Sequence, residues 1–294
     1  MRKFWGMRRE MRFSRPAPSG ARSAVTQYPL PPGYPFPDVF TGISGRDAML
    51  HAGVSRQYYD VGLSAVRCLE TGLALAGRSP DSVRSILDLP CGHGRVARVL
   101  RARFPQAELT VCDIDRDGVD FCATHFRATG FYSQRDFRRV RCAGSFDLIW
   151  VGSLISHLPR PATERFLSCI CPWLAPGGVL VCSSHGSAVA AWIRDGLTDG
   201  RHHMPAGPVR RALVDLIETG YGFFPHRHKG WRRLGDLRDL LAPELSYGTA
   251  LIGRSFFETL ALPAPWRVLG YLERAWADFQ DIVVIGNEPV GLMP

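Results

Sequence analysis

The clearest chemical signal in the sequence is a glycine-containing turn in the run SILDLPCGHGRV, residues 85–96. A strand-like apolar segment leads into Gly92 and Gly94, and a helix-like pattern follows. Glycines at such a turn let the backbone approach a ligand closely at the carboxyl edge of a parallel sheet. Asp113 ends the next apolar run, where a carboxylate can accept hydrogen bonds from ribose hydroxyl groups. The spacing therefore predicts a site for a nucleotide-like ligand.

Two cofactors fit this turn, because Gly92-x-Gly94-x-x-Ala97 also satisfies the fingerprint of dinucleotide-binding proteins. Asp88 favours S-adenosylmethionine over NAD, since a carboxylate against the turn repels a pyrophosphate and attracts the ammonium group of a methionine moiety. Pro90 stands in place of the usual first glycine and has no amide donor for a phosphate. An NAD-dependent oxidoreductase stays the alternative.

Together with the elements that follow, this turn resembles that of the class I S-adenosylmethionine-dependent methyltransferases. The resemblance rests on the Asp-x-x-x-Gly-x-Gly run, on Asp113, and on the segment LAPGGVL at 174–180. A bacterial subset of uncertain substrate is especially similar, through LDLPCGHGR, CDIDRDGVDFC and WVGSL. The resemblance implies S-adenosyl-L-methionine as cofactor, with Asp136 and Phe137 beside the adenine. The cofactor-binding residues that it implies are Asp88, Pro90, Cys91, Gly92, Gly94, Asp113, Ile114, Asp136, Phe137, Val151 and Gly152.

The acceptor side is marked by two histidines that follow predicted strands. His157 comes after the strand at 146–151, and His185 comes after the strand at 178–183. The first of these strands is not followed by the Asn/Asp-Pro-Pro-aromatic run of the family's amino-methylating enzymes, so O-methylation is the expected chemistry. Histidine titrates near neutral pH, and both side chains are therefore candidate general bases, with His157 preferred.

Other histidines receive simpler interpretations. His93 lies inside the glycine turn and is expected to shape it. We interpret His202, His203, His226 and His228 as solvated loop residues, because no carboxylate or cysteine is regularly spaced with them as a metal site requires. No metal site is predicted.

Alternating strand and helix patterns predict the elements that must hold these residues. The expected fold is α/β, a Rossmann-like, doubly wound and mostly parallel sheet of seven strands whose last strand is antiparallel. Helices are predicted at 55–76, 94–104, 116–127, 161–174 and 266–279. Strands are predicted at 83–89, 108–113, 131–133, 146–151, 178–183, 246–252 and 281–285.

The domain organisation follows from composition. Residues 1–40 are rich in Pro, Arg and Ser and are expected to form a flexible basic arm, and residues 41–80 a helical N-terminal segment. Residues 81–290 form the expected methyltransferase domain, in which the Arg-, His- and Gly-rich segment 186–244 is an inserted substrate lid.

Composition and charge limit the partners. The formal net charge is +9, but residues 1–22 hold seven Arg or Lys and one Glu, so most of the basicity belongs to the arm. A nucleic-acid substrate is therefore disfavoured, although RNA methylation and non-catalytic cofactor binding stay as alternatives. No run of apolar residues is long enough to span a membrane. We expect a cytoplasmic monomer or homodimer that acts on a small molecule, and a glycan or a lipid-linked compound would be a compatible acceptor.

Overall fold

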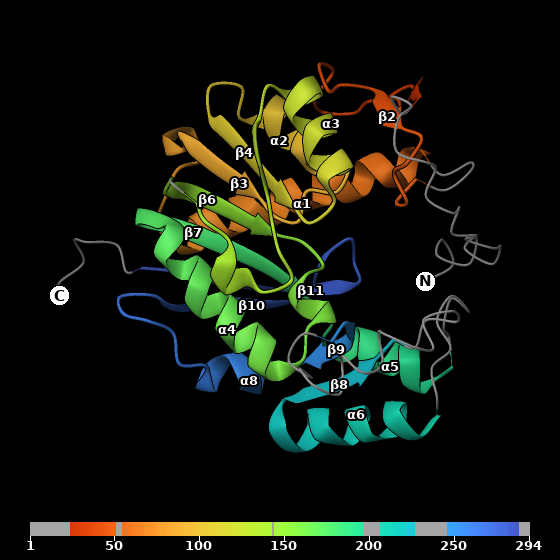
Figure 1. Cartoon of the computed structure of the whole chain (residues 1–294), viewed down its shortest axis with the longest axis vertical. Coiled ribbons are helices and arrows are strands. Elements are labelled where there is room, and N and C mark those ends of the chain that lie inside the picture. The colour runs from red at the N-terminus through yellow and green to blue at the C-terminus, as the bar shows by residue number, and fades with distance from the viewer. Residues whose placement is uncertain (1–23, 51–54, 143, 197–205, 227–245, 288–294) are drawn as a thin grey trace.

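The computed structural model of the chain describes residues 24–50, 55–142, 144–196, 206–226 and 246–287 (Figure 1). Its helices are α1 (Ser55–Leu75), α2 (Ala97–Arg103), α3 (Arg116–Phe126), α4 (Arg160–Ile170), α5 (Ser187–Arg194), α6 (Ala206–Thr219) and α8 (Arg254–Thr259). Its strands are β1 (Val25–Gln27), β2 (Gly42–Ser44), β3 (Ser85–Asp88), β4 (Glu108–Asp113), β5 (Thr129–Tyr132), β6 (Phe146–Val151), β7 (Leu174–Ser184), β8 (Tyr221–Pro225), β9 (Gly248–Ile252), β10 (Arg267–Trp276) and β11 (Gln280–Gly286). Short 3₁₀ turns include η3 (Phe137–Arg139), η4 (Ile155–His157) and η5 (Cys171–Trp173).

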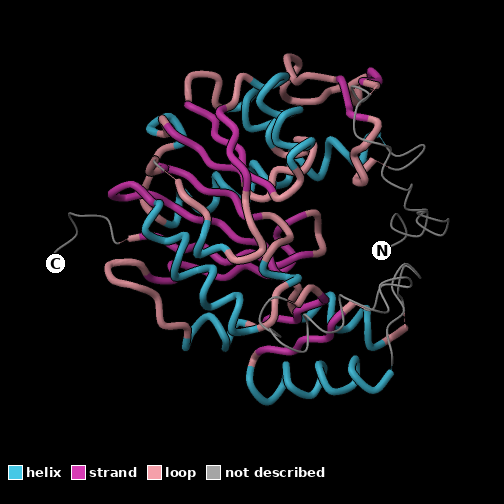
Figure 2. The backbone as a smooth tube through the Cα atoms, in the orientation of Figure 1, coloured by secondary structure: helices cyan, strands magenta, loops and turns pink. Residues whose placement is uncertain are grey.

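A seven-stranded sheet in the order β10-β11-β7-β6-β3-β4-β5 forms the centre of the molecule (Figure 2). β11 runs antiparallel to both of its neighbours, and the other neighbouring pairs are parallel. The expected Rossmann-like sheet with an antiparallel last strand is confirmed. The chain order reverses between β3 and β6, and open α/β sheets place their ligands in the crevice at the carboxyl ends of such strands.

Helices cover both faces of this sheet (Figure 1). Alternate strand residues such as Ile86 and Trp150 pack against α1, α2 and α3 on one face. Their neighbours Leu87 and Ile149 pack against α4 and α8 on the other. Because both faces are buried, the central strands are mostly apolar, which is why sequence patterns located them.

The helix expected at 266–279 is wrong, because these residues form β10 and the turn into β11. β10 contains two register shifts against β11, one between Val268 and Gly270 and one between Leu272 and Trp276. Such bulges break the alternation of a regular strand. Apolar residues then recur every three or four positions, which imitates a helix.

The strand expected at 246–252 exists as β9, but its expected place in the main sheet is wrong. β9 pairs antiparallel with β8 in a separate two-stranded sheet. Ala250 belongs to the apolar cluster under α4 and α8, whereas Leu251 belongs to a cluster with α5 and α6. β9 is buried on both sides and therefore has the composition of a central strand.

The second half of the expected arm at 1–40 packs against α1. β1 pairs with β2, and the Tyr59 hydroxyl on α1 donates a hydrogen bond to the Tyr28 carbonyl at 2.7 Å. The Tyr34 ring packs against the Tyr59 ring at 5.8 Å, and Val39 is buried. Residues 1–23, which carry most of the arm's charge, lie outside the described part of the chain. Within that part, no helix has the length and apolar character needed to cross a membrane.

Candidate functional site

The glycine turn connects β3 to α2 at the carboxyl edge of the sheet. Gly92 has φ +49° and Gly94 has φ +80°, both in the left-handed region that favours glycine. A Cβ on Gly94 would lie 2.1 Å from the Phe126 ring, so packing also requires glycine there. A Cβ on Gly92 would meet nothing within 4 Å. Gly92 therefore borders open space, as a backbone that receives a ligand should.

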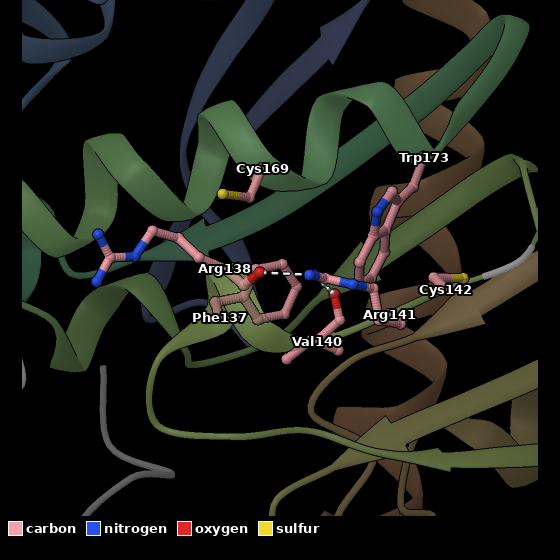
Figure 3. A pocket seen from close by; sticks show the side chains of 7 residues that line it. All are labelled: Phe137, Arg138, Val140, Arg141, Cys142, Cys169 and Trp173. Carbon is pink, nitrogen blue, oxygen red and sulfur yellow. Dashed lines mark hydrogen bonds between the residues drawn. The ribbon is translucent and has the colours of Figure 1, made fainter.

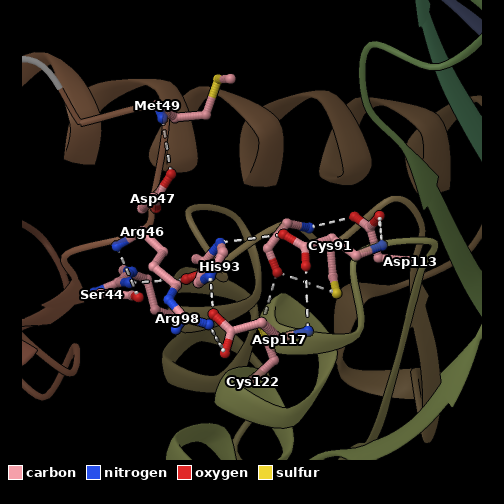
Figure 4. Close-up of polar contacts among 12 residues, drawn as sticks. Ser44, Arg46, Asp47, Met49, Cys91, His93, Arg98, Asp113, Asp117 and Cys122 are labelled. Carbon is pink, nitrogen blue, oxygen red and sulfur yellow. Dashed lines mark hydrogen bonds and ion pairs between the residues drawn. The ribbon is translucent and has the colours of Figure 1, made fainter. Parts of the chain in front are cut away.

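Buried thiols and amides hold this turn in place (Figure 4). The Cys91 amide donates to the Cys112 carbonyl at 3.0 Å. The thiols of Cys91 and Cys122 both approach the Gly92 carbonyl, at 3.4 and 3.5 Å. The contact with the Cys122 thiol and burial raise the pKa of Cys91, so its thiol keeps the hydrogen that it donates. The Cys91 side chain therefore has a structural role in holding the turn.

Asp88 ends β3 with an enclosed carboxylate. The residue is 1% exposed, and no described donor meets either side-chain oxygen with full hydrogen-bond geometry, although the Ala97 amide lies near enough to favour the charged form. Burial raises the pKa of Asp88 well above its usual range, and repulsion from Asp113 adds to the shift. The Ala97 amide and the Arg95 guanidinium oppose it only in part. A buried carboxylate without a partner is costly, and a cationic group would satisfy it.

Asp113 ends β4 beside the turn. One carboxylate oxygen accepts a hydrogen bond from the Gly92 amide at 2.7 Å, and the other accepts one from the Asp115 amide at 2.9 Å. Each oxygen has a second lone pair, so the carboxylate can also accept hydrogen bonds from a ligand. The next residue, Ile114, is 58% exposed and offers an apolar surface next to it.

Asp136 and Phe137 lie on the loop after β5. The Asp136 carboxylate accepts a hydrogen bond from Arg138 Nε at 2.8 Å and lies 3.6 Å from Arg139 Nε. These arginines hold the pKa of Asp136 below its usual value. The carboxylate is thus already paired, which leaves the backbone of this turn for contact with an adenine ring.

The Phe137 ring packs on Phe166 at 4.7 Å and on Trp173 at 5.1 Å. A small pocket of about 250 Å³ adjoins it (Figure 3). The residues that line the pocket are Phe137, Arg138, Val140, Arg141, Cys142, Cys169 and Trp173. The Phe137 side chain is therefore a packing residue between η3 and α4.

Val151 and Gly152 end β6. The Val151 side chain is fully buried in the core, and a Cβ on Gly152 would lie 2.6 Å from the Trp150 indole nitrogen. Both residues can contact a cofactor only through their backbone.

Pro90 and His93 belong to the glycine turn between β3 and α2. His93 Nε2 lies 3.0 Å from the Asp117 carboxylate, which agrees with the expected role of His93 in shaping this turn.

Arg98 ties the N-terminal segment to the glycine turn, a role that sequence patterns missed. It is 1% exposed, yet its guanidinium donates to the Gly94 carbonyl at 3.0 Å and to the Phe40 carbonyl at 2.9 Å. It also donates to the Tyr58 hydroxyl, which in turn donates to Asp47 at 2.6 Å. The ordered residues before α1 thus brace the turn.

The structure brings His157 and His185 together at the carboxyl edges of β6 and β7. Their ring centroids are 5.5 Å apart. The His226 ring, at the end of β8, lies 6.0 Å from His157, and the Tyr247 ring, just before β9, stacks on His157 at 4.8 Å with an interplanar angle of 16°. Four rings from four segments therefore form one cluster, which we call the histidine cluster: His157, His185, His226 and Tyr247.

The interpretation of His226 as a solvated loop residue is wrong. His226 Nε2 is 2.8 Å from the Thr249 hydroxyl, and its ring packs 5.6 Å from Tyr247. Pairing of β8 with β9 places it there, and nothing local in the sequence marks that pairing. His202, His203 and His228 lie outside the described residues. Among the residues that are described, no group of three or more potential ligands is arranged for a metal ion.

The two candidate bases, His157 and His185, differ in how readily their rings can accept a proton. His157 Nδ1 lies 2.7 Å from the Gly248 carbonyl, and because a carbonyl only accepts, Nδ1 carries the hydrogen. In the neutral ring Nε2 is then the basic nitrogen. Burial and the neighbouring His157 lower the pKa of His185 to about 3, although a backbone hydrogen bond to Ala250 opposes the shift. His185 is therefore a poor general base near neutral pH.

Comparison with known proteins agrees with this geometry. Residues 86–178 match the family described as a methyltransferase domain. A malonyl-[acyl-carrier protein] O-methyltransferase of Methylococcus capsulatus is 30% identical over 205 residues, which cover 66% of this chain and 71% of that protein. The chain belongs to the class I S-adenosylmethionine-dependent methyltransferases.

Other proteins named as methyltransferases are also similar to this chain. The ribosomal RNA large subunit methyltransferase G of Streptomyces coelicolor is 33% identical over 127 residues, 43% of this chain and 31% of that protein. The chain spans half or less of the length of three of the curated relatives that it matches. Among solved structures, an S-adenosylmethionine-dependent methyltransferase from Clostridium acetobutylicum is 11% identical, with a TM-score of 0.47, over 83% of this chain and 96% of that one.

Proposed function

We propose that this methyltransferase transfers a methyl group from S-adenosylmethionine to an oxygen atom of a small acceptor. The observation that carries the proposal is Asp88, a buried carboxylate without a hydrogen-bond partner among the described residues, directly before a turn whose Gly92 borders open space. A carboxylate in that position fits the ammonium group of the cofactor's methionine moiety and repels a pyrophosphate.

The neighbouring residues fit the rest of the cofactor. Asp113 has free lone pairs for the ribose hydroxyls, and Ile114 offers an exposed apolar surface to the adenine. When bound, the cofactor supplies a methyl group on a positively charged sulfur. The protein then has to hold the acceptor oxygen in line with that methyl and exclude water.

His157 is the proposed general base. Its hydrogen bond to the Gly248 carbonyl leaves Nε2 as the basic nitrogen, and the Tyr247 ring stacked on it restrains its orientation. The proton of an acceptor hydroxyl would pass to Nε2. The name of the Methylococcus relative, an O-methyltransferase, supports oxygen as the nucleophile.

The segment 186–244 is proposed as the substrate lid. Its described part contributes His226 to the histidine cluster, and Tyr247 follows it directly. Tyr247 keeps 48% of its surface exposed, but the packing around its hydroxyl raises its pKa to about 12, with a contribution from the Asp113 charge. Because the Tyr247 ring also stacks on His157, the residues that follow the proposed lid adjoin the proposed base.

Calorimetric titration with S-adenosylhomocysteine, with NAD titrated in parallel, tests the cofactor. We expect micromolar affinity for S-adenosylhomocysteine and no heat of binding from NAD, and the reverse result would indicate an oxidoreductase.

Ribosomal RNA methylation, suggested by the Streptomyces relative's name, is tested by RNA binding with and without residues 1–23. Salt-sensitive RNA binding that is lost on truncation would favour that function over a small acceptor.

A further inference from the structure

Arg95, in the glycine turn just before α2, carries a charge that no described residue pairs with directly. Its guanidinium lies over the Trp276 ring, 5.9 Å from the centroid, and makes no hydrogen bond or ion pair within the described part of the chain. Asp47 lies near enough to favour the positive charge. The Asp47 carboxylate, however, already accepts hydrogen bonds from the Tyr58 hydroxyl at 2.6 Å and the Met49 amide at 2.9 Å. Arg95 is therefore a cation that lacks a direct counter-ion among these residues.

The Arg95 side chain lies in a recess that solvent reaches. Burial lowers the pKa of its guanidinium, against the opposing effects of Tyr58, Asp47 and Asp88. The residue is nevertheless only half-buried, and none of its nitrogens belongs to the enclosed polar atoms that lack a partner. A charged group that is surrounded by protein and still touches solvent can contact a ligand. Because an unpaired charge in such a place is costly, an anionic group would stabilise it.

Arg95 and Asp88 are neighbours that do not pair with each other. The Trp276 ring under the guanidinium packs on Trp150 at 5.1 Å, and Trp150 lies opposite Asp88 in the register of β3 with β6. The charge of each residue favours the ionised form of the other. No hydrogen bond joins them, however, since neither oxygen of Asp88 meets a donor with full geometry. The two opposite charges are thus close together without neutralising each other.

Such a pair of charges fits a ligand that carries both an ammonium group and a carboxylate. In an α-amino acid these two groups are attached to the same carbon atom, and the methionine moiety of S-adenosylmethionine has this structure. Arginine suits the carboxylate, because its planar guanidinium can donate two parallel hydrogen bonds to the two oxygens. An ammonium group on Asp88 would therefore bring its own carboxylate toward Arg95.

We propose that Arg95 binds the carboxylate of the cofactor's methionine moiety and makes the site specific for the intact amino acid. The inference rests on the proposed function and adds a specificity-determining residue to the same site. Arg95 supplies binding alone, and no bond forms or breaks at its side chain. A ligand that keeps the adenosine, the sulfur and the ammonium group but lacks the carboxylate should bind poorly.

The test compares two ligands that differ only in this carboxylate, S-adenosylhomocysteine and decarboxylated S-adenosylhomocysteine, by calorimetry. A hydrogen-bonded contact between charged groups corresponds to roughly a 10- to 100-fold change in affinity. We therefore expect the wild-type protein to bind S-adenosylhomocysteine roughly 10- to 100-fold more tightly than the decarboxylated ligand. In Arg95→Met this preference should disappear, because the affinity for S-adenosylhomocysteine falls while that for the decarboxylated ligand does not.

Two further variants are the controls. Arg103 also lies beside an aromatic ring, with its guanidinium 4.9 Å from the Phe104 centroid, but it pairs with Glu70 at 2.6 Å. Arg103→Met should therefore keep the wild-type preference. Asp88→Asn should weaken both ligands by a similar factor, because both carry the ammonium group, and should keep the preference as well.

The proposal is overturned if the wild-type protein binds the two ligands equally tightly, a comparison that does not depend on the folding of any variant. It is also overturned if the preference survives in Arg95→Met. In both cases binding of S-adenosylhomocysteine to the wild type would leave the proposed function standing. Absent binding of S-adenosylhomocysteine would refute that function first.

Discussion

Substitution of Asp88 by Asn should weaken cofactor binding and stabilise the free protein. A hydrogen bond between charged groups is worth about 1.5–3 kcal/mol, so loss of the carboxylate should raise the Kd for S-adenosylhomocysteine roughly 10- to 100-fold. In the free protein the same carboxylate is buried without a partner and its pKa is raised. The native state of the wild type therefore binds more protons than the unfolded state above pH 3.8, and its stability falls as pH rises.

The size of the stability effect follows from proton linkage. Between pH 3.8 and the raised pKa of Asp88, the wild type should lose about 1.4 kcal/mol per pH unit relative to Asp88→Asn. Urea unfolding of both proteins at pH 4, 5, 6 and 7 measures this difference. The control is Asp60→Asn, which removes a half-exposed carboxylate on α1 that pairs with Arg56. It should change neither the slope nor the Kd.

Calorimetry in two buffers supplies an independent readout. A carboxyl group with a raised pKa releases its proton when it pairs with an ammonium group. The binding enthalpy of the wild type should therefore depend on the ionisation enthalpy of the buffer, and that of Asp88→Asn should depend on it less. The reasoning is refuted if Asp88→Asn binds S-adenosylhomocysteine as tightly as the wild type, or if it is less stable than the wild type at pH 7.

Three further predictions concern Asp113 and the two histidines. Asp113→Ala should weaken S-adenosylhomocysteine binding by about 1–3 kcal/mol in calorimetry, because the ribose hydroxyls lose their acceptor, and unchanged affinity would remove the ribose assignment. His157→Gln should lower methyl transfer from radiolabelled cofactor about 10²- to 10⁴-fold while cofactor affinity stays unchanged, whereas an unaffected rate would exclude it as the base. His185 stays neutral in the native state but is protonated in the unfolded state below pH 6.5, so stability is lost as pH falls. Between pH 7 and 4.5 the wild type should lose about 2–3 kcal/mol relative to His185→Gln in urea unfolding, and parallel pH profiles would contradict the burial of this ring.

The central fold could be predicted from the sequence because its strands are buried on both faces. β3, β4, β6 and β7 are short apolar runs between turns, and the helices that cover them are amphipathic. β10 could not be recognised, since its two bulges shift the register against β11 and imitate a helical repeat. The sequence does not reveal that β9 belongs to a separate sheet, because burial between two clusters gives it the composition of a central strand.

The candidate site, like the fold, could be predicted from the sequence only in part. Asp88, Gly92 and Gly94 lie in one continuous turn, so spacing alone predicted their proximity, and the order of the strands adds Asp113. His157 and His185 follow adjacent parallel strands, which brings them to one edge. His226 and Tyr247 reach that edge through pairing of β8 with β9, and no local pattern marks which segments pair.

A crystal structure of the protein with S-adenosylhomocysteine tests the central claim most directly. The account predicts the ammonium group within hydrogen-bonding distance of Asp88, the ribose hydroxyls on Asp113, and the sulfur facing the histidine cluster. A ligand whose ammonium group lies away from Asp88, or whose sulfur faces away from His157, would contradict the assignment of both the cofactor site and the acceptor site.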